Sequence, residues 1–197
     1  VVGRVPSIKQ LETESDTGAA QLAVSKSSGS SGWEAGEAFR KLRTSIAYMD
    51  VDSPPRIIVV TSPQPNDGKS TTAANLAAAI AISGQHVTLV DGDLRRPSVA
   101  DGFGLVEGAG LTDVLIGRVT LDDVLQDSPD FEGLHVLAAG SIPPNPSELL
   151  GSKAMQHLIE ELGRTGLVVI DAPPLLPVTD AAILSRVCDG AIVVVSH

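Results

Sequence analysis

The chain has 197 residues, of which 43% are apolar, and a formal net charge of −10 at pH 7. This length fits one α/β domain with extensions, and the apolar content is sufficient for a sizeable core. The negative charge argues against a nucleic-acid-binding surface and against a patch for anionic membranes. A single cysteine, Cys188, excludes a disulfide within the chain, and no run of about 20 apolar residues is present to span a membrane.

The first 32 residues differ in composition from those that follow. A short apolar start at 1–6 precedes residues 12–32, which are mainly Ser, Gly, Thr and Ala. This composition is typical of a flexible linker. We therefore expect a folded domain over residues 33–197 and place residues 1–32 outside it.

Residues 34–49 show helical periodicity, with apolar side chains at Ala35, Phe39, Leu42 and Ile46. The opposite face carries Glu37, Arg40, Lys41 and Arg43. Glu37 and Arg40 are three residues apart, a spacing that allows an ion pair along the helix. Taken alone, this face is typical of a solvated helix surface.

The segment from 56 to 83 predicts a strand, a loop and a helix in succession. Residues 56–61 are β-branched and follow Pro54-Pro55, which favours a buried strand. Residues 69–83 are rich in alanine and lack proline, which favours a helix packed closely on a sheet. The loop between them directs backbone N–H groups toward the positive end of the helix, where phosphate oxygens are attracted.

This loop supplies the predicted nucleotide ligands, which are Asn66, Asp67, Gly68, Lys69, Ser70 and Thr71. Lys69 is predicted to reach the β- and γ-phosphates, and the Ser70 hydroxyl to bind Mg²⁺. The general phosphate-loop pattern requires glycine five residues before Gly68, where this chain has Pro63. The loop therefore belongs to a variant class or to none, and a helix N-terminus that carries Gly-Lys-Ser by coincidence is the alternative.

Acidic residues follow two further predicted strands, at 86–91 and 167–170. Asp91 and Asp93 follow the first, with Arg95 close enough in sequence to neutralise a phosphate or a partner carboxylate, and Asp171 follows the second. Carboxylates near a phosphate site hold Mg²⁺, often through water, and accept protons. Each aspartate alone is more often a helix or turn cap. Three at strand ends after a Gly-Lys-Ser loop favour function.

The remaining pattern completes an α/β fold. We expect short helices and glycine-rich turns over 101–130, strands at 134–138 and 191–195, and helices at 152–163 and 178–188. Alternating strands and helices with buried apolar strands predict a mostly parallel central sheet with helices on both faces. The ligand then lies beyond the carboxyl ends of the strands, where all the acidic motifs fall.

Over residues 33–197 the chain resembles the bacterial protein-tyrosine kinases of capsule and exopolysaccharide systems, which are P-loop NTPases related to MinD and ParA. The resemblance rests on five elements in order: Glu37-x-x-Arg40-x-x-Arg43, the Ser62-to-Ser70 loop, Asp91-x-Asp93-x-Arg95, the segment 143–150 (Pro-Pro-Asn-Pro-Ser-Glu-Leu-Leu), and Asp171-x-Pro173. The family often has glycine at Asn66, and asparagine tolerates the left-handed backbone conformation.

The resemblance implies an ATP- and Mg²⁺-dependent tyrosine autokinase that regulates polysaccharide polymerisation and export. In that family, Lys69, Asp91, Asp93 and Asp171 correspond to catalytic residues, Asn66 to Thr71 and Arg95 to nucleotide ligands, and Ser70, Asp91 and Asp171 to metal ligands. The helix with Glu37, Arg40 and Arg43 corresponds to the contact of a ring-shaped homo-oligomer.

The resemblance also implies a location at the cytoplasmic face of the bacterial plasma membrane. Residues 1–6 resemble the segment that follows the second transmembrane helix in fused members, so we expect a juxtamembrane segment and a membrane-embedded activator domain on the same polypeptide. Protein tyrosines are the implied substrates. The family's C-terminal tyrosine cluster is not found up to His197, so we expect the kinase domain to be C-terminally incomplete.

Two other functions stay open. One is a MinD/ParA-like assembly ATPase that transfers phosphate to water, although the signature lysine of those proteins is replaced here by Gln64. The other is a polysaccharide co-polymerase module that binds ATP without kinase activity. Tyr48, the only tyrosine, lies beside Ile46 and Met49, and we expect it to pack against the domain rather than to accept phosphate.

Overall fold

The computed structural model describes residues 30–50, 52–106 and 108–195. Its centre is a six-stranded sheet with the order β3-β4-β2-β5-β1-β6. Every neighbouring pair is parallel except β3–β4 at one edge. The strands are β1 (Ile57–Thr61), β2 (Val87–Asp91), β3 (Gln126–Asp127), β4 (Leu134–Leu137), β5 (Leu167–Asp171) and β6 (Gly190–Val193). The predicted fold class is confirmed.

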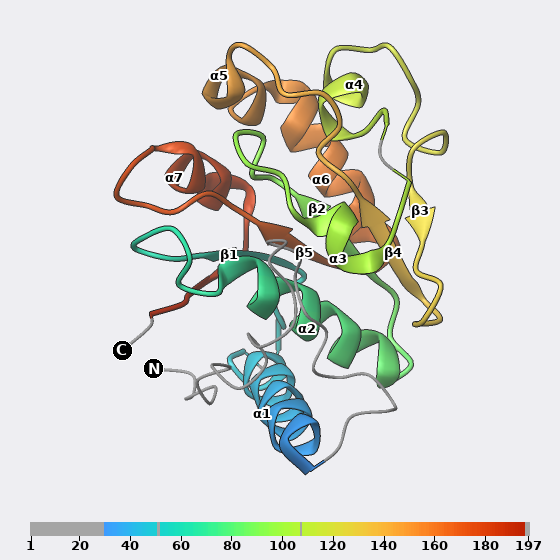
Figure 1. Ribbon diagram of the computed structural model, residues 1–197, viewed down its shortest axis with the longest axis vertical. Coiled ribbons are helices and arrows are strands. Elements are labelled where there is room, and N and C mark those ends of the chain that lie inside the picture. Colours follow the sequence, from blue (N-terminus) through green and yellow to red (C-terminus); the bar gives the residue numbers. More distant parts are fainter. Residues whose placement is uncertain (1–29, 51, 107, 196–197) are drawn as a thin grey trace.

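Helices cover both faces of the sheet (Figure 1). On one face α2 (Lys69–Ile82) packs on the strands and α1 (Ser30–Ala47) packs on α2, with α3 (Val99–Phe103) beside them. The other face is covered by α4 (Leu111–Leu115), α5 (Pro146–Leu150), α6 (Lys153–Thr165) and α7 (Asp180–Leu184).

Alternation along the strands divides the core into two clusters. In β1, Ile58 and Val60 face the α1–α2 side and Val59 faces the α6 side. In β5, Val169 faces the first side, and Val168 and Ile170 face the second. Successive side chains of a strand point to opposite faces, so near-continuous apolar strands are buried on both sides. The alanines of α2 allow that helix to lie close to the sheet.

The strand register brings the acidic residues together. In the β2–β5 pair Asp91 lies opposite Asp171, and in the β1–β5 pair Val60 lies opposite Asp171. The loop that follows β1 therefore begins at the same edge of the sheet as both aspartates. This edge, formed by the carboxyl ends of three adjacent parallel strands, is where a doubly wound sheet binds its ligand.

The predicted elements match the structure with three differences. The antiparallel edge strand β3 and the helix α5 were not predicted, because each is very short. The predicted helix at 178–188 is instead α7 followed by a 3₁₀ turn, Ser185–Val187. The linker and juxtamembrane predictions covered residues 1–32, of which 1–29 lie outside the described residues. Residues 30–32 belong to α1, so this helix begins three residues before the predicted domain boundary.

Helix α1 confirms the predicted buried face and corrects one prediction. Phe39, Leu42 and Ile46 are buried against α2, as the periodicity indicates. Tyr48 is 72% exposed, and its neighbour Met49 is 58% exposed. The expectation that Tyr48 packs was wrong because Tyr48 follows Ile46 by two residues, which places it about 200° around the helix axis from the buried face. Within the described residues no helix is both long and apolar enough to cross a membrane.

Candidate nucleotide site

The loop between β1 and α2 has the backbone geometry of a phosphate cradle. Gly68 is the N-cap residue of α2 and has a φ of 88°, in the left-handed region that glycine adopts without steric cost. Asn66 also lies there with a φ of 67°, and it is the only residue other than glycine that does so in the described chain. Asparagine tolerates this conformation, as predicted for this position. The Asp67 carboxylate accepts a hydrogen bond from the Gln64 N–H at 3.0 Å, which closes the turn.

Lys69 lies at the centre of the charged groups. Its Nζ is 2.9 Å from Asp93 Oδ2 and 3.5 Å from both carboxylate oxygens of Asp171. It also donates to Ser70 Oγ at 3.0 Å, and that hydroxyl donates to Asp171 Oδ2 at 2.5 Å. The structure thus brings together four of the predicted site residues from three separate segments. Asp171 is fully buried, and Lys69 is nearly so.

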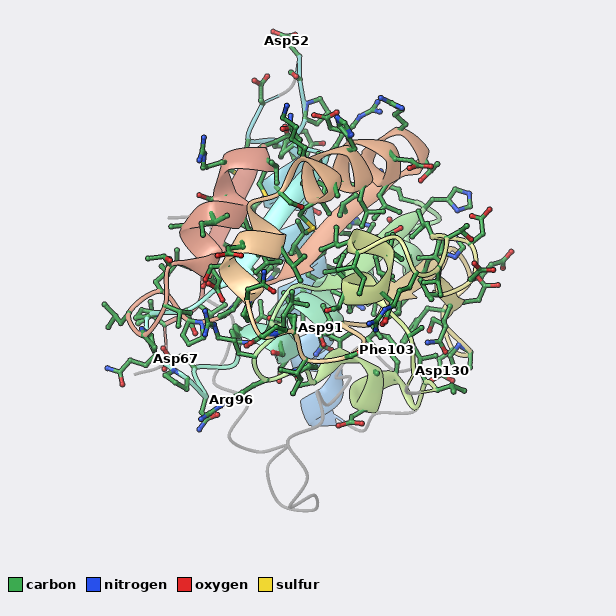
Figure 2. The ribbon with its side chains drawn as sticks, turned by 90° about the horizontal axis from the view of Figure 1, so that it is seen from above. Asp52, Asp67, Asp91, Arg96, Phe103 and Asp130 are labelled. Carbon is green, nitrogen blue, oxygen red and sulfur yellow. The ribbon has the colours of Figure 1, made fainter. Side chains whose placement is uncertain are left out.

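Asp91 lies in the same cluster with different contacts. Its Oδ1 accepts the Asp93 N–H at 3.2 Å, and its Oδ2 accepts the N–H groups of Ser98 and Val99, both at 3.0 Å. It therefore fixes the turn from 92 to 99. In the view of Figure 2, Asp91 lies toward the centre of the molecule, whereas Asp67 and Arg96 lie at its periphery.

The electrostatics of the cluster show an excess of negative charge. Burial, together with the Asp171 charge, raises the pKa of Asp91 to about 7. Burial also raises the pKa of Asp171 to about 6, although the Lys69 ammonium opposes this. Burial lowers the pKa of Lys69, but the carboxylates of Asp171 and Asp93 outweigh it, and the net direction is upward.

This donor set fits a nucleotide with a divalent cation. Three buried carboxylates face one ammonium group, so the cluster has about two uncompensated negative charges when fully ionised. Carboxylate and hydroxyl oxygens are the ligands that Mg²⁺ uses beside phosphates. Ser70 Oγ and Asp171 Oδ2 are near enough to serve one ion, and Gly68 and Lys69 start a 14-residue helix whose N-terminal N–H groups suit phosphate oxygens.

Arg95 is directed away from this cluster. Its Nε donates to Asp180 Oδ2 at 2.7 Å, and its Nη2 donates to Ser147 Oγ at 3.0 Å. The sequence left two partners open for Arg95, a phosphate or a carboxylate, and in the structure Arg95 forms an ion pair with the carboxylate of Asp180. No pattern in the sequence singles out Asp180 or predicts a role for Ser147. The location of Ser147 in the segment 143–150 was the available signal, whereas Asp180 has the appearance of an ordinary residue in a first helical turn.

Two charged residues of α1 pair with each other within the helix. Arg40 Nε donates to Glu37 Oε2 at 2.8 Å, and both side chains are 39% exposed. Arg43 is half-buried and has no ion pair within the described part of the chain. The i,i+3 pair is the one that the sequence predicted for a solvated face, so an oligomer contact through Glu37, Arg40 and Arg43 remains a prediction.

Comparison with known proteins places this site in a family. Residues 53–197 match the family model described as "ParA: NUBPL iron-transfer P-loop NTPase". The structure of MinD from Pyrococcus horikoshii in complex with Mg-ADP superposes with a TM-score of 0.60 at 26% identity, covering 71% of this chain and 57% of that one.

The tyrosine kinases among the relatives are more similar. The chain is 44% identical to tyrosine-protein kinase YwqD of Bacillus subtilis over 81% of its length and 68% of that protein. It is 38% identical to tyrosine-protein kinase etk of Escherichia coli over 76% of its length, but it spans only 21% of that longer protein. The ETK kinase domain superposes with a TM-score of 0.77 at 38% identity, covering 82% of this chain and 64% of that domain. The chain therefore belongs to the bacterial protein-tyrosine kinases, within the ParA-like P-loop NTPases.

Proposed function

We propose that this domain transfers the γ-phosphoryl group of ATP to protein tyrosine in the presence of Mg²⁺, and that it does so in a system for capsule or exopolysaccharide polymerisation and export. The observation that carries the proposal is the convergence of Lys69, Asp93 and Asp171 on one another from three strand ends. The kinase relatives supply the reaction, and the Mg-ADP complex of the related MinD supports the cofactor.

The residues divide into those that bind and those that move a proton. Lys69 and the N–H groups of residues 66–71 hold the phosphates, and Ser70 and Asp171 hold Mg²⁺, with Asp91 at the rear of the site. When bound, Mg²⁺ neutralises charge on the phosphate oxygens. Asp93 receives the proton of the tyrosine hydroxyl as that oxygen attacks phosphorus and the bond to ADP breaks. Its carboxylate is the one nearest Lys69, so it lies beside the phosphate-binding group.

The wider setting follows from the relatives. Several of them are much longer than this chain, which fits a catalytic domain joined to a membrane-embedded activator on one polypeptide. We propose that the domain acts at the cytoplasmic face of the plasma membrane and assembles with copies of itself into a ring through Glu37, Arg40 and Arg43. Its substrates are then tyrosines of neighbouring copies and of other proteins.

One experiment separates this function from its alternatives. The domain is incubated with Mg²⁺ and γ-labelled ATP, with and without a synthetic copolymer of glutamate and tyrosine, and label is measured as phosphotyrosine and as free phosphate. A tyrosine kinase gives protein-bound phosphotyrosine. An assembly ATPase gives free phosphate alone, and a co-polymerase module without kinase activity binds ATP and releases neither product. Lys69→Met is the control for labelling by a contaminating kinase.

A further inference from the structure

The turn that follows β2 is tied to two helices by a group of polar side chains that the nucleotide site does not use. Asp180, at the start of α7, has no exposed surface. Its Oδ2 accepts from Arg95 Nε at 2.7 Å, and its Oδ1 accepts from Ser147 Oγ at 2.6 Å. Arg95 Nη2 reaches Asp180 Oδ1 at 3.3 Å as well as Ser147. We call these three residues the Arg95 cluster.

A fully buried carboxylate requires partners for both oxygens, because an unpaired buried charge is costly. Burial raises the pKa of Asp180, but the hydrogen bonds from Arg95 and Ser147 outweigh it and hold the pKa below its usual value. Asp180 is therefore charged at neutral pH. The guanidinium is held by a bidentate contact with fixed geometry, which a flexible ammonium group does not reproduce.

The cluster acts on the backbone that carries Asp93. The Arg96 N–H donates to the Asp93 carbonyl at 3.2 Å and to Asp93 Oδ1 at 3.1 Å. Asp93 Oδ2 in turn contacts Lys69 at 2.9 Å. In the sequence, Leu94 and Arg95 separate Asp93, which faces Lys69, from Arg96, whose N–H orients the Asp93 carboxylate. Leu94 anchors the turn in the core, and Arg95 is the side chain that fixes it to α5 and α7.

We propose that Arg95, Asp180 and Ser147 are positioning residues for phosphoryl transfer, which hold the Asp93 carboxylate in the orientation that the reaction needs. This inference rests on the proposed function, since it assigns these residues to the reaction in which Asp93 takes part. This positioning role differs from the role predicted from the sequence, in which Arg95 contacts the nucleotide. Transfer depends on sub-ångström placement of the reacting groups, whereas nucleotide affinity depends on the phosphate loop, so the cluster affects the first more than the second.

The test compares Arg95→Ala, Arg95→Lys and Asp180→Asn with the parent domain. Three quantities are measured: affinity for Mg-ADP by calorimetry, kcat for phosphate transfer to the glutamate–tyrosine copolymer per nucleotide-binding site, and thermal stability. We expect kcat per binding site to fall roughly 10- to 100-fold in Arg95→Ala while ADP affinity changes less than about threefold. Arg95→Lys recovers only part of the rate. The double variant Arg95→Ala with Asp180→Asn is no slower than the more damaged single variant, because the residues act as one unit.

The controls separate positioning from general destabilisation. Arg118→Ala removes another arginine–aspartate pair, at 3.7 Å to Asp113, on a side chain that is 69% exposed and outside the turn. This variant keeps the parent's kcat. Unchanged kcat per binding site in Arg95→Ala overturns the proposal, as does a loss of ADP affinity equal to the loss of rate, which indicates a nucleotide contact. If the parent gives no phosphotyrosine, the proposed function fails on its own, and the same comparison is made on release of free phosphate, which uses the same Asp93.

Discussion

The carboxyl edge of the sheet and the outer face of α1 both carry arranged charges, but they differ in burial and in the origin of the partners. At the sheet edge, Lys69 is paired with carboxylates 24 and 102 residues away in sequence, and all of these groups are buried or nearly so. On α1, Arg40 pairs with Glu37 three residues away, and both side chains are substantially exposed.

The difference shows which charges need a functional explanation. An exposed i,i+3 pair forms wherever the sequence allows and contributes little to stability. Buried, like-charged carboxylates raise the free energy of the fold, so their presence indicates a ligand that compensates them. The buried charges at the sheet edge therefore indicate a site by themselves. A role for the exposed charges of α1 can be established only by measurements of assembly.

The largest expected effect is on transfer when Asp93 loses its charge. Asp93→Asn keeps the size of the side chain but removes the proton acceptor, so we expect phosphotyrosine formation to fall about 10²- to 10⁴-fold. Nucleotide affinity should change far less, because the phosphates are held by Lys69 and the loop. Rates with the copolymer and ADP binding by calorimetry check this. A parental transfer rate in the variant removes Asp93 from the reaction.

Replacing Lys69 tests whether the carboxyl edge of the sheet binds the nucleotide. In Lys69→Met we expect nucleotide affinity to fall by roughly 30- to 150-fold, since a charged hydrogen bond is worth about 2–3 kcal/mol. The variant should also unfold more easily at neutral pH, because Asp93 and Asp171 lose their buried partner. Calorimetry and circular dichroism provide the two readouts. Parental affinity in a folded variant contradicts the site.

The buried carboxylates also predict a dependence of stability on pH. The pKa of Asp171 is about 6 in the folded protein, above its ordinary value of 3.8. A raised folded-state pKa stabilises the fold below the ordinary pKa, and this stability is lost as pH rises through about 6. The nucleotide-free parent should therefore lose on the order of 1–3 kcal/mol more than Asp171→Asn between about pH 4 and pH 8.

Urea unfolding at several pH values measures this difference. Asp123→Asn is the matched control. Hydrogen bonds from Thr120 lower the pKa of Asp123, so its carboxyl group changes the stability only below about pH 4, outside the range that is compared. Equal slopes for the parent and Asp171→Asn show that the Asp171 carboxylate is already ionised across the range.

A smaller effect on stability is expected on α1. Arg40→Ala with Arg43→Ala should change the free energy of unfolding by less than about 0.5 kcal/mol per site. If α1 forms the ring contact, the double variant has a lower mass than the parent by light scattering with Mg²⁺ and ATP. Lys41→Ala, on an exposed neighbour in the same helix, is the control. Equal masses, with a clearly oligomeric parent, make the face an ordinary solvated surface.

The smallest expected effect is at Tyr48. The side chain is largely exposed, so Tyr48→Ala should leave the free energy of unfolding within about 0.5 kcal/mol of the parent. Urea unfolding checks this, and Phe39→Ala, on the buried face of the same helix, is the contrast, with an expected loss of about 3–5 kcal/mol. A large loss in Tyr48→Ala shows that the ring is packed after all.

The sequence was sufficient for the strands, the long helices and the loop, because apolar periodicity and β-branched runs report burial directly. It was also sufficient to place Asp91, Asp93 and Asp171 at the ends of apolar strands, while their roles at a nucleotide stay predictions. It was insufficient for Arg95, whose partner Asp180 lies 85 residues away and is brought close only by the packing of α7. Tyr48 was misplaced because its neighbours in the sequence are apolar, although a residue two positions after Ile46 lies on the opposite face of a helix. The elements β3 and α5 are too short to produce a periodic signal.

The contacts of Lys69 with Asp93 and Asp171 give its ammonium group buried partners from within the chain. Under the proposed function, ATP takes Lys69 from Asp93 and Asp171, and those carboxylates then need another cation. We therefore expect Mg²⁺ and the phosphates to bind with positive cooperativity, because each removes a cost that the other imposes. The affinity for ATP alone or for Mg²⁺ alone then includes the cost of breaking the contacts of Lys69 with its carboxylates. It is therefore weaker than the contacts that ATP and Mg²⁺ make when both are bound.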